Sequence, residues 1–285
     1  MSLAKLMAVL LLLWPASAAD AQGRAGQLVD IGGRQLFINC LGEAKDGQPI
    51  VILDSGLGSD STSWKLVQPE VAKFARVCSY DRAGLGRSEK APKLGDGDSI
   101  IADLHRLLVA ANIRPPFVLV GHSLGGLNSR RYAVEHPSDV VGMVFVDSPN
   151  ENASPRFWKI FREVHRREPT PEEERLIVGE DLDMKVVEEQ AREKRWEADI
   201  PLIVLTRDSS KAPPESEFDM RREALRKEMQ AELVKRSKLG EQRVILGAGH
   251  DIQLDNPGAV IQAIRDILER TSKKQDRIAV PTSQV

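Results

Sequence analysis

The fold is decided by the stretch Phe117-Val118-Leu119-Val120-Gly121-His122-Ser123-Leu124-Gly125-Gly126. Its four leading apolar residues are typical of a buried strand, and a helix-compatible segment begins directly after the serine. A serine on such a sharp strand-to-helix turn has a strained backbone and an exposed hydroxyl. The flanking residues must be glycines, because side chains there would collide with the neighbouring strand and helix. The stretch therefore predicts that Ser123 is a nucleophile.

Short apolar segments alternate with helical patterns over most of the chain. Residues 28–31 and 35–39 flank two glycines and predict a hairpin. Further strands are predicted at residues 49–53, 75–80, 117–120, 140–146, 201–205 and 243–246, and helices at residues 99–111, 124–136 and 258–268. Strands that alternate with helices predict an α/β fold with a mostly parallel sheet, covered by helices on both faces.

Two segments interrupt this alternation. Residues 150–200 separate two strands by much more than a connection needs, and they carry an apolar stripe at helical spacing. We expect a small helical lid there, with a disordered linker as the alternative. Residues 216–238 predict a long charged helix. The expected organisation is a core at residues 22–149 and 201–272, the lid at residues 150–200, and a loose tail at residues 273–285.

The N-terminus has the pattern of a secretory signal peptide. Lys5 precedes an apolar run at residues 6–14, and two small-x-small cleavage sites follow, Ala16-Ser17-Ala18 and Ala19-Asp20-Ala21, so that the mature chain would begin near Ala19 or Gln22. An uncleaved anchor is the alternative, but the run is short for a bilayer span and Pro15 ends it. Residues 1–21 are therefore expected to be removed, leaving an exported protein that is periplasmic or secreted and has no stable membrane anchor.

Composition excludes several classes of function. The net charge is −2 and the pI is about 6.3, so no basic field favours nucleic acid as a partner. The chain has no His-x-x-x-His pair, no cysteines at ligand spacing and no dinucleotide fingerprint. We therefore expect no metal and no cofactor, and a small molecule as the partner. The oligomeric state stays open.

Three further motifs accompany the serine turn, in an order that resembles the α/β-hydrolase superfamily. Residues 53–58 (Leu-Asp-Ser-Gly-Leu-Gly) look like its oxyanion loop, residues 80–88 like the turn after the next strand, and residues 249–257 like its catalytic-histidine loop. The resemblance runs from about residue 28 to residue 268. It implies an eight-stranded, mostly parallel sheet flanked by helices, with an inserted lid, and backbone N–H groups of Leu57 and Leu124 as the oxyanion donors.

A serine hydroxyl needs a base, and the base needs an orienting acid. Of the five histidines, His250 alone follows a late strand in a glycine-containing loop, and it is the expected base. In this fold the acid lies between the nucleophile and the histidine in sequence. Asp208 follows the strand at residues 201–205 and is the favoured acid. Asp147, which ends the preceding strand, is the alternative.

The resemblance implies a serine hydrolase acting through an acyl-enzyme, most simply on a carboxylic ester of a small or medium apolar substrate. Phe157, Trp158 and Phe161 of the expected lid are candidates for its substrate pocket. Relatives that open epoxides or remove halides use an aspartate nucleophile, which Ser123 argues against. The alternatives are hydrolysis of an amide, thioester or carbon–carbon bond, acyl transfer, and a non-catalytic ligand-binding protein.

Two cysteines, Cys40 and Cys78, are too few for a disulfide-framed fold. They could pair in an oxidising compartment or remain free thiols. The resemblance places them on neighbouring strands, which makes a disulfide a testable expectation.

Overall fold

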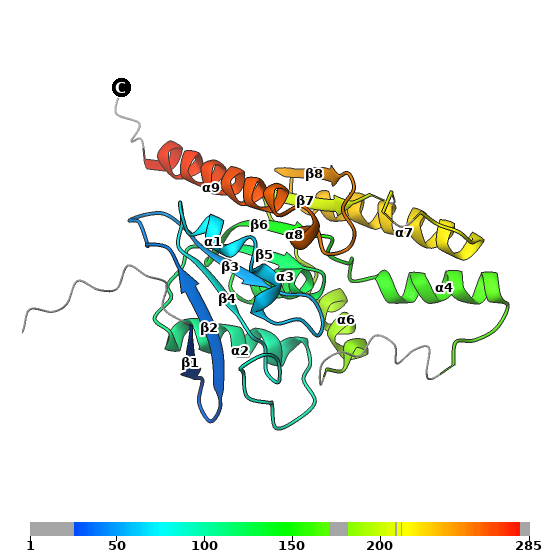
Figure 1. The fold of residues 1–285 in the computed structure, drawn as a ribbon, viewed down its shortest axis with the longest axis horizontal. Coiled ribbons are helices and arrows are strands. Elements are labelled where there is room, and N and C mark those ends of the chain that lie inside the picture. Colours follow the sequence, from blue (N-terminus) through cyan, green and yellow to red (C-terminus); the bar gives the residue numbers. More distant parts are fainter. Residues whose placement is uncertain (1–25, 171–181, 209, 212, 280–285) are drawn as a thin grey trace, which may run out of the picture.

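The computed structural model describes residues 26–170, 182–208, 210–211 and 213–279. At its centre is an eight-stranded sheet with the order β1-β2-β4-β3-β5-β6-β7-β8, in which β2 runs antiparallel to both neighbours and the other pairs are parallel (Figure 1). The strands are β1 (Gln27–Asp30), β2 (Gln35–Leu41), β3 (Ile50–Asp54), β4 (Val77–Tyr80), β5 (Phe117–His122), β6 (Val140–Val146), β7 (Leu202–Arg207) and β8 (Gly240–Ile245). The predicted fold class is confirmed, and every predicted strand overlaps an observed one.

Helices cover both faces of the sheet (Figure 1). They are η1 (Ser61–Trp64), α1 (Gln68–Val71), α2 (Gly97–Ala110), α3 (Leu124–Glu135), α4 (Ala153–His165), α6 (Met184–Glu193), α7 (Glu217–Val234), α8 (Ile252–Asp255) and α9 (Pro257–Ala279). One apolar core lies between the sheet and α2, α3 and α7, and a second lies between the sheet and α1, α8 and α9. Because the central strands are buried on both faces, they are almost entirely apolar, as the sequence pattern predicted.

The C-terminal prediction is wrong in one respect. The apolar stripe predicted a helix ending at residue 268 and a loose tail from residue 273, but α9 continues to Ala279. The apolar stripe ends at Leu268, but the backbone remains helical for about another three turns. Residues 1–21, expected to be the signal peptide, lie outside the described residues. Within the described residues, no helix has the length and apolar character needed to cross a membrane.

A disulfide joins Cys40 of β2 to Cys78 of β4. The two residues are direct partners in the antiparallel register of these strands. The sequence left undecided whether the two cysteines pair or remain free, and in the structure they pair. The link ties the N-terminal hairpin to the central sheet.

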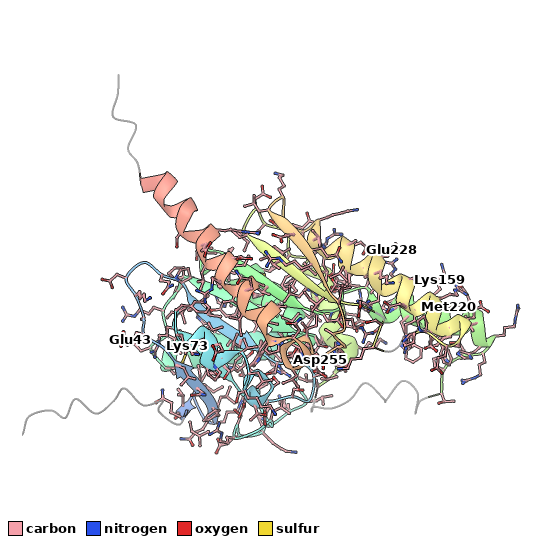
Figure 2. All side chains as sticks on the ribbon, turned by 45° about the horizontal axis from the view of Figure 1, so that its top comes forward. Glu43, Lys73, Lys159, Met220, Glu228 and Asp255 are labelled. Atoms are coloured by element: carbon pink, nitrogen blue, oxygen red, sulfur yellow. A yellow bond between two sulfur atoms is a disulfide. The ribbon has the colours of Figure 1, made fainter. Side chains whose placement is uncertain are left out.

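The segment between β6 and β7 holds α4 and α6, and α4 runs beside α7 away from the sheet (Figure 1). Arg156 of α4 pairs with Glu228 and Glu232 of α7 at 2.8 and 3.0 Å. Lys159 of α4 and Met220 of α7 mark the same end of the molecule (Figure 2). Where the segment leaves β6, the buried carboxylate of Glu151 pairs with the buried Arg236 beyond α7. The helical segment is therefore held at its base by a buried ion pair and along its length by partly exposed ones.

Candidate active site

Ser123 lies between the end of β5 and the first turn of α3. Its backbone has φ 50° and ψ −118°, a strained conformation for a residue with a side chain. The strained turn is held to the sheet, since the Ser123 N–H donates to the carbonyl of Val146 at 3.0 Å. This is the sharp strand-to-helix turn that the sequence predicted around the serine.

Two glycines around the serine allow α3 to approach the sheet closely. A Cβ on Gly121 would lie 2.3 Å from backbone atoms of Gly125, and a Cβ on Gly125 would lie 2.2 Å from the carbonyl oxygen of Asp54. Both distances are far below ordinary contact. The glycines are therefore required by packing, and together they place the start of α3 directly over the end of β3.

The loop after β3 lies against the serine turn. A Cβ on Gly56 would meet the Nδ1 atom of His122 at 2.8 Å and Cβ of Ser123 at 3.4 Å. The side chains of Leu57 and Leu124 belong to one apolar cluster. The Leu124 N–H opens a helix and has no intrahelical acceptor, and no hydrogen bond of the described residues uses the Leu57 N–H. The structure thus brings together the two predicted oxyanion donors next to Ser123.

Arg82 holds this loop in place, a role that sequence reasoning missed. The buried Arg82 guanidinium donates to Asp54 Oδ1 at 2.6 Å, to the Ser55 carbonyl at 2.7 Å and to the Gly56 carbonyl at 2.6 Å. Asn128 of α3 donates to the other Asp54 oxygen at 3.0 Å. The carbonyls of Ser55 and Gly56 are directed at Arg82. The Leu57 N–H, which lies on the opposite side of the same peptide as the Gly56 carbonyl, is therefore directed away from Arg82 and left for a substrate oxygen.

The Ser55 hydroxyl, at the start of this loop, has a structural use. It donates to the Asp60 carbonyl at 2.8 Å and lies 2.9 Å from the Ser63 hydroxyl. These bonds tie the start of the loop to its far end.

His250 and Asp147 form the second half of the site. His250 Nδ1 lies 2.7 Å from Asp147 Oδ2, and the Asp147 side chain is buried whereas that of His250 is 45% exposed. Such a pair fixes the imidazole tautomer and leaves Nε2 directed away from the carboxylate. Ser123 and His250 line the same pocket, although within the described residues no hydrogen bond joins their side chains. Bonds of this kind often close only when substrate is present.

Asp208, the favoured acid, makes no hydrogen bond to His250 among the described residues, which corrects the prediction. Its carboxylate accepts hydrogen bonds from the Ser210 hydroxyl at 2.8 Å and the Gly247 N–H at 3.2 Å. The bond from Ser210 lowers the pKa of Asp208. The reason lies in the sheet order: β6 is next to β5, so Asp147 at its end lies one strand from Ser123, whereas Asp208 follows the more distant β7.

Two arginines accompany the Asp147 carboxylate. Arg226 Nη1 of α7 lies 3.3 Å from Asp147 Oδ1, and Arg207 Nε at the end of β7 lies 3.5 Å from Oδ2. Arg226 also donates to the Arg207 carbonyl at 3.0 Å and to Glu223 at 2.5 Å. The acid is thus fixed by α7 as well as by His250. Nothing in the sequence around Arg226 signals this contact, because it depends on how α7 packs.

His122 lies beneath His250 and connects the two halves of the site. Its Nε2 lies 3.0 Å from the His250 carbonyl oxygen, and the two ring centroids are 4.7 Å apart. Burial, followed by the charge of His250, lowers the pKa of His122 to about 4. At neutral pH the His122 imidazole is therefore uncharged, with Nε2–H donating to the backbone of the His250 loop.

The pocket that holds Ser123 and His250 has a volume of about 380 Å³. Its apolar wall comes from α4, α7 and the turn after β6, and consists of Pro149, Ala153, Phe157, Leu225 and Met229. Of the three predicted pocket aromatics, only Phe157 is in this wall. Trp158 lines a different hollow, beside α6, and the buried Phe161 packs against Phe218 of α7. Phe157 and Phe161 lie one turn apart on the same face of α4, and both pack against Phe218, but only Phe157 reaches the pocket; the adjacent Trp158 points to another side of the helix.

Comparison with known proteins gives a consistent family. A sequence model described as the alpha/beta hydrolase family matches residues 50–263, more than half of the chain. "Probable transporter efuK" of Hormonema carpetanum is 34% identical over 149 residues, which are 48% of this chain and 21% of that protein. "Putative carbamate hydrolase RutD" of Variovorax paradoxus is 36% identical over 119 residues, 38% of this chain and 42% of that protein. The chain thus spans less than half the length of these curated relatives.

Among solved structures, a thermophilic esterase from Thermogutta terrifontis superposes with a TM-score of 0.60 and 20% identity. The match covers 86% of this chain and 98% of the esterase. At this level of identity the likeness extends to the fold and not to the substrate.

Proposed function

Since the chain belongs to the alpha/beta hydrolase family, we propose that it is an exported serine hydrolase that cleaves carboxylic esters of small or medium apolar substrates. One observation carries the proposal: the strained Ser123 shares a pocket with His250, whose Nδ1 is bonded to the buried Asp147. A nucleophile, a base and an orienting acid are the parts that acyl transfer through a serine requires.

In the proposed reaction Ser123 Oγ attacks the acyl carbon while His250 Nε2 takes the hydroxyl proton. Asp147 holds the imidazole in the required tautomer and stabilises its positive form. The N–H groups of Leu57 and Leu124 bind the oxygen on which negative charge develops. His250 then returns the proton to the leaving alcohol, and an acyl group remains on Ser123. Water, activated by His250 in the same way, releases the acid.

The pocket supports a substrate of limited size. Five apolar side chains form one wall, with charged groups such as Arg222 and Glu223 beside them, and the volume of about 380 Å³ is near the lower end of the roughly 300–1,000 Å³ usual for small-molecule sites. We expect short and medium acyl chains to be preferred over long ones. A series of p-nitrophenyl esters of increasing chain length would measure this preference as kcat/KM.

Export is the second part of the proposal. It is supported by the signal-peptide pattern of residues 1–21 and by the disulfide between Cys40 and Cys78, since disulfides persist in oxidising compartments. Mass spectrometry of the protein from the growth medium or periplasm should find a chain that begins near residue 22 and contains no free thiol.

The activity is tested by labelling with a fluorophosphonate together with the ester series. The native protein should be labelled and turn over esters, and Ser123→Ala should lose labelling and about 10⁴-fold or more of kcat. A protein that neither labels nor turns over, but still binds an ester analogue, would instead be a binding protein on the hydrolase fold.

Amide or carbamate cleavage is a second candidate, favoured by the similarity to a putative carbamate hydrolase. The same nucleophile and base would serve, because only the leaving group differs. Matched p-nitrophenyl ester, p-nitroanilide and carbamate substrates with one acyl group would separate the two candidates by their kcat/KM values.

A further inference from the structure

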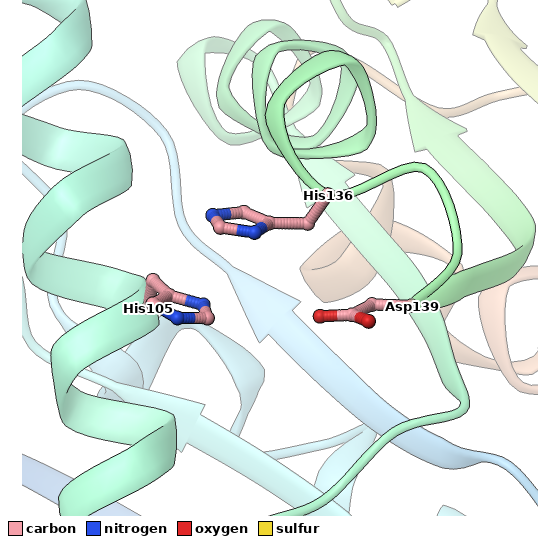
Figure 3. A group of neighbouring side chains, drawn as sticks. All are labelled: His105, His136 and Asp139. Carbon is pink, nitrogen blue, oxygen red and sulfur yellow. The ribbon is translucent and has the colours of Figure 1, made fainter.

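Three potential metal ligands meet at the opposite end of α3 from Ser123. His105 comes from α2, His136 follows the last residue of α3, and Asp139 lies in the turn before β6 (Figure 3). One ligand atom from each residue lies within 4.8 Å of those of the other two. Among the described residues this is the one group of three or more histidine, cysteine, aspartate or glutamate side chains so arranged. The spacing of these residues in the sequence gives no motif, because the fold brings them together.

The Asp139 carboxylate has no lysine or arginine partner among the described residues. Its oxygens accept a hydrogen bond of 3.2 Å from the Ser138 hydroxyl and one from the Tyr132 hydroxyl. The Arg106 and Lys194 side chains that line the neighbouring hollow have their own acidic partners, Asp103 and Glu135. A half-buried carboxylate that faces two imidazoles and has no lysine or arginine bonded to it is a favourable position for a cation.

The two imidazoles are stacked, with ring centroids 4.0 Å apart and planes 6° from parallel. Stacking of the two rings alone does not account for the carboxylate beside them. A metal site does, because metal sites commonly combine imidazole nitrogens with a carboxylate oxygen.

We propose that His105, His136 and Asp139 bind a divalent transition-metal ion, with zinc as the expected ion. Two imidazoles and one carboxylate are a usual set of three protein ligands for zinc, and they are a poor set for calcium or magnesium, which prefer oxygen. A hollow of about 480 Å³ is lined by both histidines and reaches solvent between α2 and the end of α3. Water from this hollow would fill the remaining coordination positions.

Binding requires a small rearrangement that can be observed. Zinc–nitrogen bonds are about 2.0–2.1 Å long and lie in the plane of the imidazole. Parallel rings cannot both direct a nitrogen at one ion, so at least one ring must turn out of the stack. We therefore expect zinc to change the NMR signals of the His105 and His136 rings while those of His165, on α4, stay unchanged.

The site is separate from the proposed catalytic pocket, since neither histidine lines it. An ion there would link α2, the end of α3 and the start of β6. Its expected effect is on stability, because a ligand that binds only the folded state raises the unfolding temperature.

The experiment is a zinc titration of tag-free, chelator-treated full-length mature protein, with a competing chromophoric chelator, followed by thermal unfolding with and without zinc. The wild type should bind one zinc ion at this site and unfold at a higher temperature with zinc. His105→Gln, His136→Gln and Asp139→Asn should each weaken binding by about tenfold or more and remove the thermal shift. His165→Gln is the matched control and should behave as wild type.

His250→Gln distinguishes this site from the catalytic histidine, which could also bind zinc. Anomalous diffraction from zinc-soaked wild-type crystals gives a readout independent of variant folding. A peak between His105, His136 and Asp139 supports the proposal. A peak only at His250, or zinc affinity unchanged in the His105 and His136 variants and lost in His250→Gln, would overturn it.

Discussion

The two halves of the site are built differently. On the nucleophile side, Ser123, the loop after β3 and the start of α3 are held by glycine contacts and by the buried pair of Arg82 with Asp54, whose side chains are 5% and 4% exposed. On the acid–base side, Asp147 is buried, but His250 is 45% exposed and α7 supplies the other contacts. One half is fixed by close backbone packing and the other by side chains that reach from separate elements. Mutations should therefore affect stability on the first side and activity on the second.

The largest effect is expected on the acid–base side. Asp147→Asn keeps the size of the side chain but presents an amide to His250, which favours the wrong imidazole tautomer. We expect kcat to fall by about 10⁴-fold, which corresponds to about 5.5 kcal/mol of transition-state stabilisation. The free energy of unfolding should change far less. Ester turnover and urea unfolding measure the two quantities.

Asp208→Asn is the matched control, because Asp208 was the favoured acid from sequence and, among the described residues, its carboxylate bonds only to Ser210 and Gly247. Its kcat should stay within about twofold of wild type. If Asp208→Asn were the damaging change and Asp147→Asn the harmless one, the described geometry of the acid–base side would be wrong.

This contrast also explains how far the sequence could predict the site. The turn around Ser123 is local. The strand, the glycines and the serine are adjacent in the sequence, so a short stretch determines their geometry. The acid is not local, since the choice between Asp147 and Asp208 depends on which strand lies beside β5 in the sheet. Arg82 and Arg226 act across elements 26 to 79 residues apart, and such contacts leave no pattern along the chain.

On the nucleophile side, Arg82→Met tests whether rigidity comes from the buried ion pair. It leaves Asp54 charged and buried without its cation, so we expect the free energy of unfolding to fall by about 3–5 kcal/mol. In the fraction that still folds, kcat should fall by a larger factor than KM rises, because the oxyanion donors act mainly in the transition state.

Arg76→Met is a suitable control for Arg82→Met. Arg76 is half-buried and donates to the Gly42 carbonyl at 3.2 Å, away from the oxyanion loop. Arg76→Met should lower the free energy of unfolding by about 1 kcal/mol or less. Equal losses of stability in the two variants would show that the ion pair with Asp54 has no special part in fixing the loop.

His122 joins the two halves and gives a prediction for pH. Its pKa is lowered from 6.5 to about 4 in the folded protein, so below pH 6.5 the unfolded chain binds a proton that the folded protein does not. The stability that His122 contributes is fully present above pH 6.5 and is lost progressively as the pH falls to about 4. By then the free energy of unfolding should have fallen by about 3 kcal/mol from this cause.

Urea unfolding of wild type and His122→Gln across this pH range isolates the effect. Glutamine can still donate to the His250 carbonyl but does not titrate. The variant should therefore show a shallower loss of stability between pH 6.5 and 4 than the wild type. Identical slopes would mean that the His122 imidazole is protonated as easily in the folded protein as in the unfolded chain.

The smallest effect is expected for Arg226, the contact from α7 to Asp147. Arg226→Met removes a partly exposed partner of the acid, while His250 still holds Oδ2. We expect about 1 kcal/mol of lost stability and about a tenfold fall in kcat with little change in KM, because the acid is less well oriented. Arg226→Lys should restore part of kcat, which a purely structural role would not require.

Arg221→Met is the control. It removes another arginine of α7, whose partner is Glu163 of α4, and should leave kcat within about twofold of wild type. If Arg226→Met is as active as Arg221→Met, the acid–base side is positioned by β6 and His250 alone, and α7 contributes only a wall of the pocket.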